Sequence, residues 1–397
     1  MTIEREYTEG KTTFISADVE HYSESKGQPT TSLPVFYNPR MRLNRDLSVI
    51  FLSAYMSNNR IDRICEPLTG SGVRTLRYLN ECEGTFEALM FDANPLAVDT
   101  ARRNVRRLGF QNRATVMRGD AKILLLTESR EKRFDFVDVD PFGTPAPYLS
   151  AAVQSLRPKL GLLAVTATDM PVLCGVYPRV ALRKYGGFSI RAPFVHEIAV
   201  RLLLGQIFRV AGANDSAMTP LVSLSSDHYV RVWVKIEADR KSANRLVSSY
   251  GTIRYCPSCM VTQTLPLADR QQEFVHADGC EGKYREAGPL WIGDIFDMDY
   301  LAKAESSLEK HGTEMHRRAP DVIQKMGMEA HLMDYPYVDL HAVCDRFNLS
   351  PPRNVRVMEK LRDQGYIVSP THFRPTAIRT NAQVQEIVNI IERIQEQ

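Results

Sequence analysis

The chain has 397 residues, of which 44% are hydrophobic and 24% charged, and its formal net charge at pH 7 is +3. This usage is typical of globular proteins, and the length predicts two domains rather than one. A charge so close to neutral excludes a strongly basic nucleic-acid-binding protein, so any RNA-binding surface must be a local patch.

The first residues, MTIEREYTEGK, are charged and lack the apolar segment of a signal peptide. The sequence contains no apolar run of the roughly 18 residues that cross a membrane. Seven cysteines in such a chain argue against a disulfide framework. We therefore expect a cytoplasmic protein without a membrane segment, and nothing in the sequence indicates a protein partner.

Short apolar strands alternate with helices between residues 60 and 240. After an irregular lead-in at 20–35, the predicted strands are RIDRIC, FEALMFD, ATVMRGD, FDFVDVD and GLLAVTATD. The predicted helices are VRTLRYLNE, NPLAVDTARRNVRRLG and HEIAVRLLLGQIFRVAGAND. This order predicts an α/β domain whose parallel sheet is covered on both faces, and HYVRVWVKIEA alternates as an antiparallel strand at the sheet edge.

After residue 240 the pattern changes, which predicts a domain of residues 1–240 followed by one of residues 241–397. A cysteine-containing stretch covers 250–285 and a helical region covers roughly 299–328. The segment 335–380 has the pattern helix, turn, helix and hairpin. This part therefore predicts a smaller α+β domain with a winged-helix-like end.

Polar residues and glycines follow the predicted strands where each strand ends. Gly70 and Gly72 come after the first strand, but neither GxGxxG nor a Walker lysine accompanies them, which disfavours a phosphate cradle. Asp92 ends the second strand, where an acid holds ribose hydroxyls, and Asp120-Ala121 ends the third, near an adenine amino group. Singly, each acid is an ordinary helix cap, but together they predict a nucleoside site that suits S-adenosylmethionine better than NAD.

The fourth strand ends in Asp138-Val-Asp140-Pro141-Phe142, and alternation places both aspartates on one face. The stretch resembles the acid/asparagine–proline–proline–aromatic motif of methyltransferases that act on exocyclic amino groups. An aryl amine is a poor nucleophile because its lone pair is delocalised into the ring. A carboxylate that accepts its N–H orients the lone pair and stabilises the developing positive charge. An aromatic side chain stacks on the base, which contributes about 1–3 kcal/mol.

Several long and irregular stretches carry a more specific resemblance. They are VFYNPRMRLNRDLSV (35–49), DPFGTPAPYL (140–149), TATDMPVLCGVYPRVALRKYGG (166–187), HEIAVRLLLG (196–205), GPLWIGDI (288–295) and SPTHFRPTAIRT (369–380). With them the chain resembles the tRNA (guanine(26)-N(2))-dimethyltransferase family over nearly its whole length. The resemblance implies a class I (Rossmann-like) S-adenosylmethionine-dependent methyltransferase domain, a tRNA substrate, and methylation of the exocyclic N2 of guanine 26.

Carried over by position, the resemblance also implies roles for individual residues. The implied cofactor-binding residues are Arg45, Arg74, Asp92, Asp120 and Ala121, and the implied catalytic residues are Asp140, Pro141 and Phe142. An arginine at either implied position suits the methionine carboxylate of the cofactor. The chain departs from the family pattern at Glu66, where an aspartate is expected. Asp169, after the fifth strand, either helps to place the base or only caps the next segment.

A structural zinc site is predicted by Cys256-Pro-Ser-Cys259 and a second pair of ligands, His276 and Cys280. Members of the family often carry two C-x-x-C pairs here, whereas this chain has one, so His276 and Cys280 take the place of the second. A metal-free hairpin with incidental thiols is the alternative. A catalytic zinc deaminase is disfavoured because no H-x-E element accompanies the C-x-x-C.

The C-terminal segment from Arg353 to Arg379 contains six cations against two acids. We expect these cations, with His372 and Phe373 in the wing, to contact tRNA phosphates. A solvated helix face is the alternative for this segment. For the whole chain, the alternatives are an amino methyltransferase acting on DNA or on another RNA, and a non-catalytic tRNA-binding protein.

Overall fold

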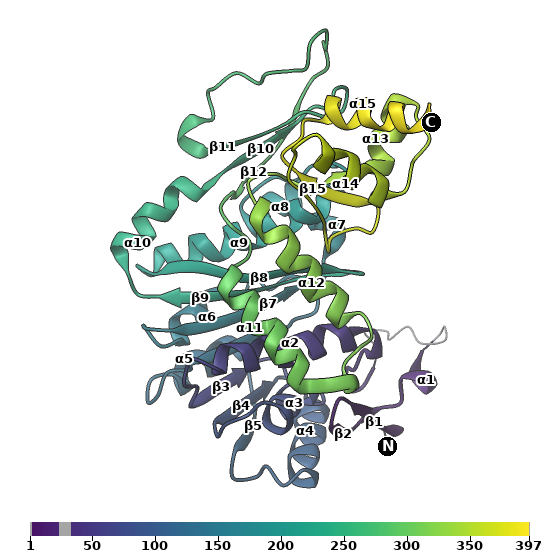
Figure 1. Ribbon diagram of the computed structural model, residues 1–397. Helices are drawn as coiled ribbons and strands as arrows, with labels where there is room; N and C mark the ends of the chain where they lie inside the picture. The colour runs from purple at the N-terminus through teal and green to yellow at the C-terminus, as the bar shows by residue number, and fades with distance from the viewer. Residues whose placement is uncertain (1, 24–32, 397) are drawn as a thin grey trace.

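The computed structural model describes residues 2–23 and 33–396, and a large mixed sheet forms its centre (Figure 1). The strands are β3 (Arg63–Glu66), β4 (Glu87–Asp92), β5 (Ala114–Arg118), β6 (Phe136–Val139), β7 (Gly161–Ala167), β8 (Ala217–Ser226) and β9 (Tyr229–Glu237). Their order is β5-β4-β3-β6-β7-β9-β8. The first five are mutually parallel, and β9 is antiparallel to both β7 and β8. The predicted parallel sheet is confirmed.

Two helical layers cover the sheet, because β6 and β7 are buried along their whole length and present apolar side chains to both faces. One layer contains α2 (Arg42–Met56), α3 (Val73–Glu81) and α4 (Pro95–Arg107), and the other contains α5 (Ala121–Glu128), α6 (Leu149–Ser155) and α9 (Val195–Ala213). Helix α4 begins as predicted, since the Asn94 side chain accepts from Leu96 N at 3.0 Å and Pro95 is the first helical residue.

The predicted position of the antiparallel strand at the sheet edge is wrong, because β8 lies outside β9. The β8 sequence AMTPLVSLSS does not alternate, and its proline argues against a strand. In the structure Pro220 stands where the register shifts between Pro220 and Val222. An edge strand tolerates this residue, since one side of its backbone has no partner strand.

A hairpin that the sequence did not reveal precedes the sheet. Its strands β1 (Glu4–Glu9) and β2 (Thr12–Ala17) pair antiparallel, and β2 packs on α3 and α4. The short helical segments of this half are α1 (Val19–Tyr22), η1 (Pro39–Met41), α7 (Met170–Leu173), α8 (Pro178–Tyr185), α10 (Arg240–Arg245) and η2 (Leu246–Ser249). Most of the lead-in predicted at 20–35 lies outside the described residues.

The C-terminal part contains two smaller sheets. Strands β10 (Tyr250–Tyr255), β11 (Thr262–Pro266) and β12 (Arg285–Trp291) form one sheet, which packs on α9, and β13 (Val338–Asp339), β14 (Val368–Pro370) and β15 (Ala377–Thr380) form the other. The helical segments are η3 (Leu267–Asp269), α11 (Met298–His311), η4 (Gly312–Glu314), α12 (Ala319–Glu329), η5 (Ala330–Leu332), α13 (Leu340–Phe347), α14 (Asn354–Asp363) and α15 (Val384–Gln395). The order β13-α13-α14-β14-β15 is that of a winged helix, whereas the domain boundary at residue 240 stays a prediction.

Within the described part of the chain, no helix combines the length and the apolar character needed to span a bilayer. All seven cysteines are free thiols, which agrees with the expectation that no disulfide framework holds this fold together.

A buried ion network joins the C-terminal part to the large sheet. Arg379 of β15 is fully buried and donates to Glu197 of α9 at 3.0 Å and to Glu329 of α12 at 3.0 Å. Glu329 also accepts from the His372 ring at 2.5 Å. Burial alone would raise the pKa of Glu329, but the attraction of His372 and Arg379 lowers that pKa to about 2.

The network corrects one sequence expectation. Arg379 and His372 were expected to contact RNA, but the Arg379 side chain and the His372 ring are enclosed by protein, and Phe373 is buried as well. Arg379 and Phe373 are therefore parts of the protein interior here. The exposed cations of the segment are Arg353, Arg356, Lys360, Arg362 and Arg374.

We expect Arg379→Met to destabilise the protein by about 3–5 kcal/mol, because it leaves buried carboxylates without their shared cation. Arg374→Met is the matched control, since Arg374 is 43% exposed and pairs with Asp339 at 2.9 Å. The control should lose no more than about 1 kcal/mol. Urea unfolding of both variants measures the two losses, and equal losses would contradict the importance of the buried network.

Candidate active site and metal cluster

The turn between β3 and α3 brings the chain backbone to the carboxyl edge of the sheet. Gly70 and Gly72 have φ of +54° and +84°, conformations that favour glycine. A Cβ atom at Gly72 would lie 2.6 Å from Met90 Cε, so a side chain there would have to displace the end of Met90. This turn therefore offers close approach to backbone atoms, as the sequence predicted.

Asp92, at the end of β4, is tied to the glycine turn. Its Oδ2 accepts from Gly70 N at 2.8 Å, and its Oδ1 accepts from Asn94 N at 2.9 Å. The carboxylate thus lies beside the glycine turn, in the place where the sequence predicts ribose binding.

The third strand end has a different local role. Asp120 is the exposed N-cap of α5, and its Oδ1 accepts from Lys122 N at 2.8 Å and Ile123 N at 3.3 Å. Ala121 is the buried first residue of the helix. In the structure Asp120 therefore caps a helix, and the predicted contact of both residues with an adenine amino group stays a prediction.

Arg74, in the first turn of α3, is buried at the carboxyl edge of the sheet, among the polar residues that gather there. It donates to Ser48 Oγ at 2.9 Å and forms a short ion pair with Asp140. Its Nε lies 3.7 Å from Asp138 Oδ2 and 3.9 Å from Glu66 Oε1. Burial would lower the pKa of this guanidinium, but the surrounding carboxylates raise it well above the ordinary value.

Asp138 and Asp140 both reach Arg74, as strand alternation predicts, but their surroundings differ. Asp138 is almost fully buried and accepts from Tyr78 OH at 2.6 Å and from Arg231 at 2.7 Å. Asp140 keeps 20% of its side chain exposed. Burial would raise the pKa of Asp140, but Arg74 and Arg231 outweigh it and lower that pKa. Asp140 is therefore an accessible, ionised carboxylate at the edge.

The residues after Asp140 present a ring to solvent. Pro141 is buried, whereas Phe142 is 58% exposed and contacts Phe36 edge-on at 4.1 Å between ring centroids. Gly143, with φ of +72°, turns the chain back, and its N–H donates to Thr168 Oγ1 at 2.8 Å. An exposed ring beside an ionised carboxylate is the arrangement that the motif predicts for binding a flat, amino-bearing ring.

Arg45, from α2, has partners of its own. Its guanidinium is buried and donates to both oxygens of Glu9, at 2.7 and 2.5 Å, and to Asn38 O at 2.9 Å. Glu9 belongs to the hairpin that the sequence did not reveal. The structure thus brings Arg74 together with Asp140, while Arg45 is bound by Glu9, and its role toward a cofactor stays a prediction.

Glu66, the departure from the family pattern, lies behind the glycine turn. Its Oε2 accepts from Thr69 Oγ1 at 2.9 Å and from Thr75 Oγ1 at 2.5 Å. Burial, with the nearby Asp138 carboxylate, outweighs the attraction of Arg74 and raises the pKa of Glu66 to about 7.

Residues that the sequence reasoning missed complete the site. Ser48, Tyr78 and Arg231 hold Arg74 and Asp138 in place. Arg231 lies within the alternating sequence of β9, and this position was the signal for it that the sequence offered. Ser48 and Tyr78 lie in helices, where the sequence gave no such signal. Asp169 accepts from the Tyr185 hydroxyl and from Lys184 Nζ at 3.3 Å.

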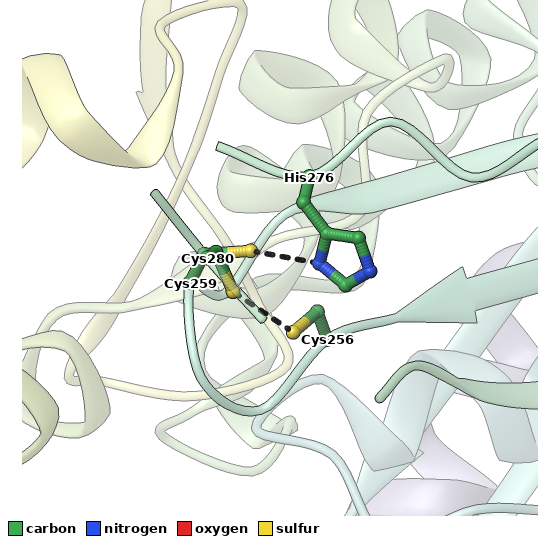
Figure 2. Close-up of side chains that lie close together, drawn as sticks. All are labelled: Cys256, Cys259, His276 and Cys280. Carbon is green, nitrogen blue, oxygen red and sulfur yellow. Dashed lines mark hydrogen bonds between the residues drawn. The ribbon is translucent and has the colours of Figure 1, made fainter. Parts of the chain in front are cut away.

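Cys256, Cys259, His276 and Cys280 gather around one point, with their ligand atoms within 4.8 Å of one another (Figure 2). The sulfurs of Cys256 and Cys280 lie 3.8 Å apart, and so do the Cys259 sulfur and His276 Nδ1. A tetrahedral ion with Zn–S distances of about 2.3 Å spaces its sulfurs by roughly this distance. The donors therefore fit zinc, and the closed set of four leaves no open coordination position for catalysis.

Comparisons with known proteins give one consistent result. The model of the family described as N2,N2-dimethylguanosine tRNA methyltransferase matches residues 13–392. A protein of Methanothermobacter thermautotrophicus named tRNA (guanine(26)-N(2))-dimethyltransferase is 36% identical over 365 residues, which are 90% of this chain and 92% of that protein. The protein of the same name from Methanosphaera stadtmanae is 34% identical over 367 residues, which are 91% of this chain and 92% of that protein.

A solved structure is similar over almost the whole fold. The complex of Trm1 from Pyrococcus horikoshii with S-adenosyl-L-methionine has a TM-score of 0.81 and 28% sequence identity. The similarity covers 98% of this chain and 99% of that chain, so it includes the C-terminal elements as well as the large sheet.

The raised pKa of Glu66 predicts a pH-dependent effect on stability. Between the ordinary pKa of 4.5 and about 7, the folded protein keeps a proton that the unfolded chain releases, so stability falls as pH rises through this window. We expect the free energy of unfolding of Glu66→Gln, a neutral isostere, to equal that of the wild type below pH 4.5 and to exceed it by roughly 3 kcal/mol above pH 7. Urea unfolding of the cofactor-free protein across this range tests the expectation, which a pH-independent difference would contradict.

The metal cluster predicts that the purified protein binds one zinc ion per chain. Cys256→Ser should lose most of the metal and lower the melting temperature, because a structural zinc site contributes directly to folding. Cys344→Ser is the control, since Cys344 is buried in α13 and absent from the cluster. Elemental analysis and thermal unfolding with and without a chelator measure both effects, and equal metal content in the two variants would refute the assigned ligands.

Proposed function

The chain belongs to the N2,N2-dimethylguanosine tRNA methyltransferase family, and we propose that it transfers methyl groups from S-adenosyl-L-methionine to N2 of guanine 26 in tRNA. The products are N2-methylguanosine and N2,N2-dimethylguanosine. The observation that carries the chemical part of the proposal is the end of β6, where the ionised Asp140 stands beside the exposed ring of Phe142.

Asp140 accepts a hydrogen bond from the guanine amino group and so orients the lone pair of N2 toward the methyl group. As the N–C bond forms, the methyl–sulfur bond would break and release S-adenosylhomocysteine, and the nearby carboxylate stabilises the positive charge that develops on N2 until N2 gives up a proton to solvent. The lowered pKa of Asp140 makes this electrostatic role stronger than its role as a base. Phe142 stacks on the base, which has left its neighbours in the tRNA to enter the site. Pro141 fixes the backbone between the two side chains.

Cofactor binding is assigned to the glycine turn and the residues around it. Ser71 Oγ and the side-chain amide of Asn44 are buried and have no hydrogen-bond partner within residues 2–23 and 33–396, so both are suited to a polar ligand. Arg74 and Arg45 supply positive charge for the methionine carboxylate, Asp92 suits the ribose, and Asp120-Ala121 suits the adenine. When bound, S-adenosylmethionine supplies the electrophilic methyl group.

The zinc cluster and the tail serve the substrate rather than the chemistry. Zinc held by Cys256, Cys259, His276 and Cys280 would fix the loops that follow β10 and β11. The exposed cations of α14 remain candidates for tRNA phosphates. We also propose that the protein works in the cytoplasm, because its thiols are unpaired and its substrate is tRNA.

We expect Asp140→Ala to lower kcat at least tenfold without weakening cofactor affinity, because the substitution removes an acceptor for substrate and leaves Arg74 free. Asp92→Ala is the matched contrast and should weaken cofactor affinity instead. Methyl transfer from labelled cofactor and calorimetric binding separate the two effects. The substrate set contains a tRNA transcript with guanine 26, the same transcript with adenine 26, and duplex DNA. Equal labelling of all three, or unchanged kcat in Asp140→Ala, would overturn the proposal.

A further inference from the structure

The segment between the fifth strand of the sheet and α9 has an unusual charge. Residues 170–196 contain Arg179, Arg183, Lys184 and Arg191 but neither aspartate nor glutamate, in a chain whose net charge is only +3. The segment forms α7, α8 and the turn that leads into α9. A local excess of this kind attracts a polyanion where the chain as a whole does not.

The same segment exposes apolar side chains beside these cations. Tyr177 is 55% exposed, and Phe188 is 42% exposed. We name as the α7–α8 face the exposed residues Val176, Tyr177, Arg179, Leu182, Arg183, Phe188 and Arg191. Within residues 2–23 and 33–396, no carboxylate forms an ion pair with the three arginines of this face, whereas Lys184 pairs with Asp169. Exposed rings between unpaired arginines are the composition of surfaces that bind single-stranded nucleic acid.

The exposure does not come from a loosely held helix. Ala181 and Tyr185, on the inner side of α8, are buried, and the Tyr185 hydroxyl donates to Asp169. Gln206 of α9 donates to Lys184 O at 2.6 Å. The inner side of α8 is thus fixed to the body of the protein, and its outer side is presented in a defined orientation.

The position of the face connects the catalytic edge with the C-terminal part. At one end, Asp169 follows Thr168, whose N–H donates to Gly143 O at 2.9 Å in the loop that carries Phe142. At the other end, Phe188 and Gly288 exchange two backbone hydrogen bonds of 2.8 Å, which join the segment to β12. Figure 1 shows α7 and α8 between the large sheet and the C-terminal elements. The segment is therefore linked by backbone hydrogen bonds both to the loop that carries Phe142 and to β12 of the C-terminal part.

We propose that the α7–α8 face binds the strand of tRNA that flanks the target guanine. Arg179, Arg183 and Arg191 contact its phosphates, and Tyr177 stacks on a base that loses its neighbour when the guanine leaves the helix. The inference rests on the proposed function, because it takes tRNA as the substrate, and it adds a second RNA contact to the one on α14.

The test compares two triple variants that carry the same loss of charge. Arg179→Gln/Arg183→Gln/Arg191→Gln removes the cations of the face. Arg106→Gln/Arg130→Gln/Lys159→Gln removes exposed cations near the end of α4, after α5 and before β7, at the opposite edge of the sheet. Filter binding of tRNA is measured in the presence of S-adenosylhomocysteine over a range of salt concentrations, so that the result does not depend on turnover.

We expect the face variant to bind tRNA roughly 10- to 100-fold more weakly than the wild type. The slope of log binding constant against log salt concentration should be shallower by about two to three, whereas the control stays within about twofold of the wild-type affinity. Tyr177→Ala should weaken binding at least about fivefold, and Tyr177→Phe, which keeps the ring, should not. Unchanged melting temperatures exclude a folding defect.

The two proposals fail separately. If the wild type methylates tRNA and the face variant binds tRNA like the control, the face has no role and the proposed function stands. If the wild type binds tRNA through this face but transfers no methyl group, the proposed function is wrong, and of the inference only the binding of tRNA by this face stands.

Discussion

The carboxyl edge of the sheet depends on one buried cation. Arg74 lies among Glu66, Asp138 and Asp140, three carboxyl groups that strand and turn geometry places close together. Without this guanidinium, Arg231 alone would balance three buried carboxyl groups, so their mutual repulsion and burial would favour protonation, and the edge would lose the charge that the chemistry requires. Even with Arg74 in place, burial and the Asp138 carboxylate raise the pKa of Glu66 to about 7. The acceptor for the amino group and the cation suited to the cofactor are thus electrostatically one unit.

Much of this edge could be predicted because strand ends and alternation are local properties. The position of Asp92 and Asp140 followed from apolar runs that stop at a polar residue, and the shared face of Asp138 and Asp140 followed from a period of two. The metal cluster followed from the spacing of cysteines and a histidine, since the ligands of a small knuckle are close in sequence.

Other features could not be predicted, because a charged residue does not reveal its partner. Arg45 pairs with Glu9, 36 residues away, and Arg379 pairs with Glu197, 182 residues away. Arg379 was expected to contact tRNA, whereas the fold encloses it beside a buried carboxylate, and nothing in the sequence indicated that Arg45 pairs with Glu9. Strand β8 was missed for a related reason, since only its place at the edge makes Pro220 acceptable.

The pairing of Arg379 with Glu197 has a consequence for how such enzymes diversify. A recombination event at the predicted boundary near residue 240 would separate α9 from β15 and pack each against a foreign surface. Arg379 or Glu197 would then be a buried charge without a partner, so the tail and α9 must be inherited together. The C-terminal part is therefore a poor exchangeable module, and changes in substrate choice are easier to reach by altering its exposed side chains than by swapping it.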